Sequence, residues 1–261
     1  MQRRQLLATA TGLVLPAPAL LLHRRAEAAQ RLAEPDPVDV ELVLAVDVSR
    51  SVDAVEMEMQ FNGYASVFRD RSFIEAMTHG PIGSIAVTLF TWSDWNIQEH
   101  LVPWAKLDSP AAAERFAAAI DAAPRRTHLY TSISAAIDFA STLFGRGFEG
   151  TRRVVDISGD GINNSGREVA DARREALEKG IVLNGLAVLD RTPPPPGLMA
   201  TQPLDEYFQE RVIGGPGAFL MVADGFESFG QAVRRKIIRE IAAAPPPGPP
   251  RGTRLRLERL V

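Results

Sequence analysis

The stretch Val40–Asp53, VELVLAVDVSRSVD, determines how the rest of the chain is interpreted. Its apolar run from Val43 to Val46 is typical of a strand that is buried on both faces of a parallel sheet. Directly after this run the chain carries one carboxylate and two hydroxyls in the spacing D-x-S-x-S, at Asp47, Ser49 and Ser51. In an open α/β sheet, side chains just past the carboxyl end of a central strand point into the crevice where ligands bind.

These three side chains offer only oxygen donors, which suit a hard divalent cation such as Mg²⁺. We therefore interpret the loop as half of a metal site. The alternative is local: Asp47 and Ser49 would form an Asx- or ST-type turn, and Ser51 would cap the next helix. Because the pattern is short, the loop alone does not decide between the two.

The composition is that of an ordinary globular protein: 261 residues, 46% hydrophobic and 23% charged, with a formal net charge of -3. This charge gives no support to nucleic acid or an anionic membrane as a partner, because both would call for a basic face. Cysteine is absent, which excludes disulfides, thiolate metal sites and cysteine nucleophiles. The four histidines lack the close spacing of a zinc site.

The first 28 residues resemble a twin-arginine export signal. Arg3-Arg4 precedes an apolar stretch from Leu6 to Leu22, and a small-x-small cleavage pattern follows it. Two prolines inside the apolar stretch argue against an uncleaved membrane-spanning helix. We expect residues 1–28 to be removed, the mature chain to have no membrane span, and the protein to be periplasmic or otherwise exported.

Strands alternate with helices along the remaining chain. Strands are predicted up to Asp47 and at Ile85–Thr91, Asn96–Val102, Arg153–Ser158, Ile181–Leu189 and Ala218–Val222. Helices are predicted at Asp53–Asp70, Pro110–Ala122, Thr131–Phe144, Ser165–Lys179, Leu204–Val212 and Phe226–Ile241. Reciprocal caps are expected at two of these starts, from Asp53 with Glu56 and from Ser165 with Glu168.

This alternation predicts an α/β fold: a doubly wound, mostly parallel six-stranded sheet with helices on both faces. The strand at 96–102 returns after a brief turn, so it is expected to be an antiparallel edge strand. We predict one domain at residues 39–243, after a linker at 29–38 and before a disordered proline-rich tail at 244–261.

Two further loops bring oxygen donors to the same edge of the predicted sheet. Thr131 opens one helix, and Asp160 follows the strand Arg153–Ser158. Three separate loops would then supply five side chains to one point, and a chance match becomes less plausible with each loop. The candidate ligands are Asp47, Ser49, Ser51, Thr131 and Asp160.

With these loops the chain resembles a von Willebrand factor A-type domain with its metal-ion-dependent adhesion site. The D-x-S-x-S loop matches directly, the family's threonine maps to Thr131, and its aspartate maps to Asp160 in SGDG. Thr127 is the alternative threonine, but it would leave HLY awkwardly in the first turn of the helix. The resemblance covers roughly Asp39 to Ile241 and implies a site for Mg²⁺ or Mn²⁺.

Three other segments, SGDGINNSG, VIGGPGAFLMVAD and RRKIIREI, resemble a narrower family of exported bacterial A-type domains, domain of unknown function 1194. That likeness implies no particular partner. In physical terms, two aspartates balance the charge of a divalent ion and hydroxyls add ligands without charge. An Asp or Glu carboxylate of a partner protein is then the natural sixth ligand.

An enzyme is the first alternative. Aspartyl-nucleophile phosphatases need a second acid where this chain has Ser49, and neither phosphate-binding glycine motif is present. A Ser-His-Asp hydrolase would need His128 near Ser49 or Ser51, and G-x-S-x-G is missing. The second alternative is an A-type domain that binds protein without metal. We predict a binding protein rather than an enzyme.

Other polar and aromatic residues are given structural roles. Trp92, Trp95 and Trp104 are expected to be packing anchors. Asp94, Asn163 and Asn164 are expected to satisfy turns. The charged residues of the last helix are interpreted as its solvated face: Arg234, Arg235, Lys236, Arg239 and Glu240.

Overall fold

The computed structural model describes residues 34–189 and 202–242. The predicted export signal at 1–28 and the predicted tail at 244–261 lie outside these residues. The chain divides after Pro35, and the fold below is that of the part beginning at Asp36. Among the described residues, no helix combines the length and apolar character needed to cross a membrane.

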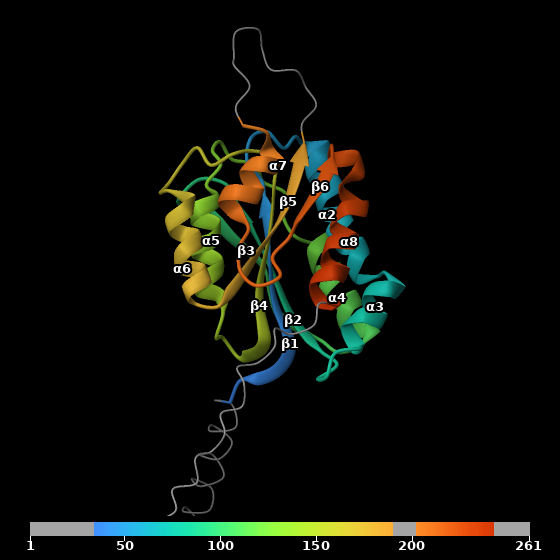
Figure 1. The fold of residues 1–261 in the computed structure, drawn as a ribbon. Helices are drawn as coiled ribbons and strands as arrows, with labels where there is room; N and C mark the ends of the chain where they lie inside the picture. Colours follow the sequence, from blue (N-terminus) through green and yellow to red (C-terminus); the bar gives the residue numbers. More distant parts are fainter. Residues whose placement is uncertain (1–33, 190–201, 243–261) are drawn as a thin grey trace, which may run out of the picture. The chain divides into compact units, whose positions relative to one another are not determined.

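A six-stranded sheet in the order β3-β2-β1-β4-β5-β6 forms the centre of this part (Figure 1). Its strands are β1 (Asp36–Asp47), β2 (Ile85–Trp92), β3 (Gln98–Leu107), β4 (Phe148–Gly159), β5 (Ile181–Leu189) and β6 (Leu220–Asp224). All neighbouring strands are parallel except β2 and β3, which are antiparallel. The predicted mostly parallel sheet with one antiparallel edge strand is confirmed.

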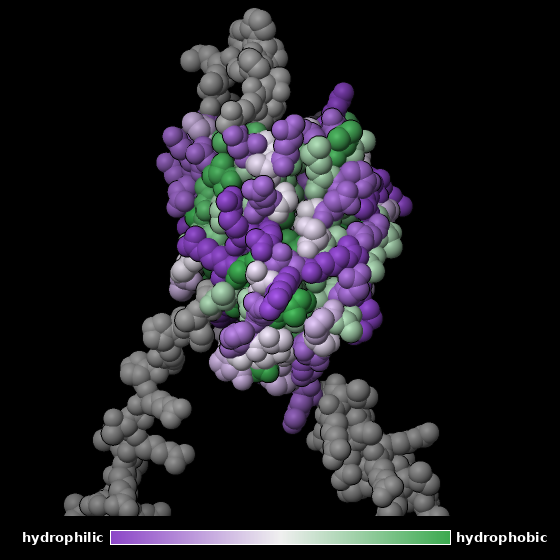
Figure 2. All heavy atoms as spheres, turned by 90° about the vertical axis from the view of Figure 1, so that its right-hand side faces the viewer, coloured by the Kyte–Doolittle hydropathy of each residue, from purple (hydrophilic) through white to green (hydrophobic). Residues whose placement is uncertain are grey.

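Helices cover both faces of the sheet in two groups (Figure 1). One face carries α2 (Ala54–Phe68), α3 (Arg71–Thr78), α4 (Pro110–Asp121) and α8 (Phe229–Ala242), with a 3-10 turn at Phe226–Ser228. The other carries α5 (Ile133–Leu143), α6 (Val169–Glu178), α7 (Leu204–Tyr207) and a π-helical turn at Phe208–Val212. Figure 2, which looks at the side of α8, shows mainly hydrophilic side chains with separate apolar patches between them.

The central strand β1 explains why its sequence is apolar without interruption. Leu42 and Leu44 pack into the core under α2 and α8, whereas Val43 and Ala45 pack into the core under α5 and α6. Both faces of the strand are therefore covered, and polar residues cannot alternate with apolar ones.

Two strands begin earlier than predicted. β1 starts at Asp36 and β4 at Phe148, and these two residues pair with each other in the parallel ladder. The added residues are held by backbone pairing between the two strands. Because they do not form an apolar run, their composition does not indicate a strand.

One of the two predicted helix caps is present. Asp53 Oδ1 accepts from the Val55 and Glu56 backbone N–H groups at 2.7 and 2.9 Å, and Glu56 Oε2 accepts from Asp53 N at 2.8 Å. The cap predicted from Ser165 and Glu168 is wrong. α6 begins only at Val169, and no side chain caps it.

Candidate metal centre

The carboxyl ends of β1 and β4 place the first and last candidate ligands side by side. Val46 of β1 pairs with Ser158 of β4, so the loops after these strands leave the sheet together. β2 flanks the other side of β1, where Asp47 pairs with Trp92. In Figure 1 the carboxyl ends of the parallel strands, where the candidate ligands lie, are at the end of the sheet marked by the arrowhead of β5.

Asp47 is fully buried, and its two carboxyl oxygens have different surroundings. Oδ1 accepts a hydrogen bond from Ser49 N at 2.7 Å, so the expected Asx-type turn is present. Oδ2 is buried and receives no hydrogen bond of good geometry from the described residues, although the Asp160 backbone N–H is near enough to lower the pKa of the carboxyl group. The local turn thus accounts for only half of this carboxylate, and a buried oxygen without a good hydrogen bond calls for an explanation such as a bound ion.

Ser51 joins the Asp47 loop to the Asp160 loop. Its hydroxyl lies 3.2 Å from the Ser49 hydroxyl and donates to Asp160 Oδ1 at 2.7 Å. Ser51 does not cap α2, since Asp53 does so. A Cβ atom placed on Gly159 would lie 3.0 Å from Asp47 Oδ2, so the β4 backbone passes tightly against that carboxylate.

Thr131 lies on the third loop and is buried. Its carbonyl accepts from Asn164 N at 2.8 Å, and its N–H donates to Asn164 Oδ1 at 2.9 Å, which fastens this loop to the Asp160 loop. Thr131, Ser51 and Asp160 all line one cavity of about 630 Å³. Thr127 lines a different cavity, so Thr131 is the threonine that faces the other candidate ligands.

The neighbouring asparagines do more than satisfy the turn assigned to them. Asn163 Nδ2 donates to Ser165 O at 3.0 Å, as a turn residue would, but its Oδ1 also accepts from Ser134 N at 3.1 Å in the first turn of α5. Ser165 donates its hydroxyl to Asp94, whose Oδ1 also accepts from Trp95 N. The loops that carry the candidate ligands are therefore held together by side chains that are not ligands themselves.

The charge balance of the site favours a cation. Burial, and next the nearby charge of Asp160, raise the pKa of Asp47 to about 8. A divalent ion between the two carboxylates would reverse this effect and release a proton on binding. The described residues hold no cluster of three or more His, Cys, Asp or Glu side chains suited to a metal. A bound ion would therefore also need the hydroxyls of Ser49, Ser51 and Thr131, and all five predicted donors fit an oxygen-only set.

Exposed apolar side chains stand on the loops beside this site. Trp95, Leu129 and Tyr130 are 62%, 65% and 51% exposed. The packing role predicted for Trp92 and Trp104 agrees with the structure, because Trp92 is fully buried and the Trp104 indole donates to Leu143 O at 3.0 Å. It is wrong for Trp95. The position of Trp95 in the turn between β2 and β3 could have indicated from the sequence that its side chain is exposed.

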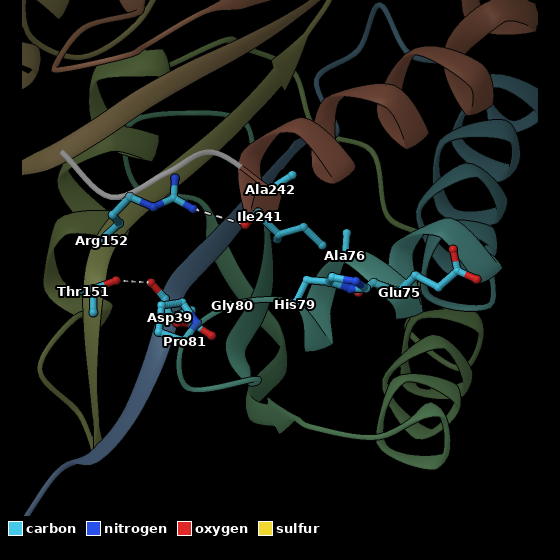
Figure 3. A pocket seen from close by; sticks show the side chains of 10 residues that line it. All are labelled: Asp39, Glu75, Ala76, His79, Gly80, Pro81, Thr151, Arg152, Ile241 and Ala242. Atoms are coloured by element: carbon cyan, nitrogen blue, oxygen red, sulfur yellow. Dashed lines mark hydrogen bonds between the residues drawn. The ribbon is translucent and has the colours of Figure 1, made fainter. Parts of the chain in front are cut away.

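A cavity of about 500 Å³ lies at the opposite end of β1 and β4 (Figure 3). The Asp39 carboxylate on its wall accepts from the backbone N–H groups of Ile82 and Gly83 at 3.1 and 2.9 Å. Arg152 donates to Glu240 O at 2.7 Å. Both charged groups already make hydrogen bonds to the backbone of the same chain. We therefore do not choose this cavity as the candidate site.

Comparisons with known proteins agree with the fold. The model of the family described as "Protein of unknown function (DUF1194)" matches residues 37–245. No curated protein matches the chain in sequence. Proximal thread matrix protein 1 from the mussel byssus is similar in structure, with 13% identity, a TM-score of 0.59, and coverage of 80% of this chain and 50% of that one.

Two further structures show the same likeness. One is proximal thread matrix protein 1 with a zinc-occupied MIDAS motif, at 12% identity and a TM-score of 0.54, covering 80% of this chain and 50% of that one. The other is a von Willebrand factor type A protein from Catenulispora acidiphila, at 13% identity and a TM-score of 0.51, covering 78% and 43%. The chain spans half or less of these proteins. At such identities the likeness establishes the von Willebrand factor A-type fold.

Proposed function

The chain belongs to the family described as protein of unknown function (DUF1194), and we propose that it is an exported domain that binds a partner protein through a divalent cation. One observation carries this proposal. The loops after β1 and β4 meet through the Ser51 hydroxyl and Asp160, beside a buried oxygen of Asp47 that receives no hydrogen bond of good geometry from the described residues.

We propose Asp47, Ser49, Ser51, Thr131 and Asp160 as the donors that hold the ion. Their oxygen-only chemistry favours Mg²⁺ or Mn²⁺, although a similar fold carries zinc in its MIDAS motif. Two carboxylates neutralise the ion, and the hydroxyls add no charge. The ion therefore keeps enough Lewis acidity to accept an Asp or Glu carboxylate from the partner.

The surroundings of the site support a protein as the partner. Trp95, Leu129 and Tyr130 form an exposed apolar rim, and exposed aromatic residues of this kind often anchor protein interfaces. Arg50 lines a cavity of about 370 Å³ beside Tyr130 and would attract further acidic groups of the same partner.

A hydrolase is a weaker proposal. Ser49 and His128 are neighbours through a backbone bridge, so the proximity that such an enzyme needs is partly met. However, His128 Nε2 makes no hydrogen bond among the described residues, and the nearby acid is Glu99 at 3.9 Å. No base–nucleophile hydrogen bond therefore supports catalysis.

A metal-dependent capture experiment tests the proposal. Full-length protein immobilised in Mg²⁺ is expected to retain a periplasmic partner that EDTA releases, and Asp160→Ala is expected to retain none. Asp205→Asn is the matched control, because Asp205 lines the same cavity but is not a proposed ligand. If the partner were retained equally in EDTA and by Asp160→Ala, the proposal would be wrong.

A further inference from the structure

A second cluster of charges lies inside the protein, away from the metal-site loops. Lys236 of α8 and Asp156 of β4 are fully buried, and Glu240, one turn after Lys236, is 1% exposed. The prediction that Lys236 and Glu240 belong to the solvated face of the last helix is therefore wrong. Arg235 and Arg239, on the same helix, are exposed as predicted.

The Lys236 ammonium contacts both acids. Its Nζ forms an ion pair with Asp156 Oδ1 and another with Glu240 Oε1 at 2.7 Å. Apart from the ion pair, neither carboxyl oxygen of Asp156 has a hydrogen-bond partner among the described residues. The Phe219 ring lies 5.8 Å from Nζ, and the buried Tyr64 completes the surroundings with a nearby aromatic ring.

This arrangement is poorly explained as an ordinary ion pair. Among the described residues, Lys236 is the one base in contact with the two carboxylates; Arg152, whose charge also acts on Glu240, donates to the Glu240 backbone carbonyl instead. Burial raises the pKa of Asp156, and it raises the pKa of Glu240 to about 7, so neutral forms of both acids become accessible. A buried ion pair is also weak support for stability, because removing the charges from water costs about as much as the pairing returns.

We propose that Lys236 and Asp156 form an intramolecular isopeptide bond, with Glu240 carrying the protons. An amine and a carboxylic acid do not condense readily in water, where both are ionised. Here the core favours the neutral form of the acid, holds the two groups in contact and excludes the water that would reverse the reaction. The inference does not depend on the proposed metal site.

The step balances without a cofactor or an oxidant. Glu240 takes a proton from the ammonium, and the freed lone pair of Lys236 Nζ attacks Cγ of protonated Asp156 to form a C–N bond. Glu240 returns that proton to one hydroxyl of the tetrahedral intermediate and takes the second proton from the nitrogen, and the C–O bond breaks to release water. One ammonium and one carboxylic acid thus become one amide and one water molecule, and the remaining proton stays on Glu240.

Asn184 is the other group from which an amide could form. Its Nδ2 donates to Glu240 Oε1 at 3.1 Å, and its Oδ1 accepts from Phe219 N at 3.0 Å. It makes no hydrogen bond to Lys236, whereas Asp156 contacts the ammonium directly. The contacts favour Asp156, and the leaving group separates the two cases, because Asn184 would release ammonia instead of water.

Mass spectrometry of the purified full-length protein tests the bond. The intact mass is expected to be lower than the sequence mass by one water molecule, once the N-terminus has been located. Trypsin cleaves after Arg153, Arg167, Arg235 and Arg239, and a linked Lys236 resists cleavage. The expected product is therefore a branched peptide that joins residues 154–167 to residues 236–239.

Variants test the proposed role of Glu240 in forming the bond. Glu240→Gln is expected to give unlinked peptides, and Glu227→Gln, an exposed control near the start of α8, is expected to give the branched peptide. An unlinked 236–239 segment in the folded wild type would overturn the proposal. So would the loss of ammonia, or a dehydrated but unbranched 154–167 peptide, which cyclisation at Asp160-Gly161 would produce. A branched peptide in Glu240→Gln would overturn the role of Glu240.

Discussion

The protein buries acidic side chains in two places along or beside β4, and the two differ in the source of the neutralising charge. At the edge of the sheet, Asp47 and Asp160 converge with hydroxyls and no basic side chain is among the proposed donors. Four residues earlier on β4, Asp156 meets Lys236 inside the core. In the core, a lysine of the same chain contacts the acids. At the edge of the sheet, the proposed cation comes from solution and serves a function.

The largest expected effect is on partner binding at the edge of the sheet. Removing the ion with EDTA, or replacing Asp47 with Ala, is expected to abolish Mg²⁺-dependent binding, because the ion is itself part of the interface. Surface plasmon resonance with the captured partner in Mg²⁺ and in EDTA measures this. The conservative Lys236→Arg change in the core is the contrast and should leave metal dependence intact. If Asp47→Ala kept full metal dependence, the distinction between the two clusters would fail.

The next largest effect is on stability and comes from the buried charges Lys236, Asp156 and Glu240, which we call the core cluster. Lys236→Met removes the proposed bond and leaves both acids buried without a cation, which is expected to lower the free energy of unfolding by about 3–5 kcal/mol or more. Arg235→Met is the matched control on the same helix, and its exposed position predicts a change within about 0.5 kcal/mol. Urea unfolding followed by circular dichroism measures both. Equal effects of the two substitutions would show that the buried lysine has no special role.

Metal binding at the proposed site should stabilise the protein by less than Lys236→Met destabilises it. A ligand at a hundred times its Kd raises the free energy of unfolding by about 2.7 kcal/mol if it binds only the native state. A protein of this size should then show a Tm increase on the order of 5–10 °C. Differential scanning fluorimetry with Mg²⁺ or Mn²⁺ measures the shift. Asp160→Ala should show none, whereas Glu227→Gln should shift like the wild type.

The pH dependence separates the two clusters further. Without metal, the raised pKa of Asp47 means that the native state retains a proton that the unfolded state has lost. Stability should therefore fall as pH rises from about 4 towards 8. Saturating Mg²⁺ or Asp47→Asn should remove this decline. Urea unfolding at pH 5, 6, 7 and 8 measures the slope. An identical slope with and without Mg²⁺ would contradict the assignment.

The smallest effect on the fold is expected at the apolar rim. Trp95→Ala should change the free energy of unfolding by no more than about 0.5 kcal/mol, because the side chain is exposed. It should nevertheless weaken partner binding by about 1–2 kcal/mol. Ile82→Ala is the control, since Ile82 is also exposed but stands before the start of β2. Equal loss of affinity in both variants would remove the rim from the interface.

The sequence predicted most of the fold because its strands are continuous apolar runs. The site loops followed from the same pattern, since each polar cluster comes directly after a strand or opens a helix. The core cluster was missed because Lys236 and Glu240 look like the exposed pair of an amphipathic helix. A signal was present elsewhere: Asp156 interrupts the apolar strand VVDIS, and a charge there requires a buried partner. Helical periodicity alone does not show which strand residue that partner meets.

The first turn of α6 was misplaced for a related reason. Ser165 and Glu168 have the spacing of a capping box, but the Ser165 hydroxyl is used by Asp94, on a loop that is distant in sequence. Such a tertiary contact outweighs a local capping preference, and nothing within the segment indicates it.

Gly159 has a consequence for tracing this protein through genomes. A methyl group there would lie 3.0 Å from the Asp47 carboxylate and 3.4 Å from the Trp92 ring, so the position has little tolerance for any larger amino acid. Homologues that keep Asp47 and Trp92 packed in this way therefore need a glycine at this position. A single alignment column thus tests whether a homologue keeps the close approach of β4 to the Asp47 carboxylate.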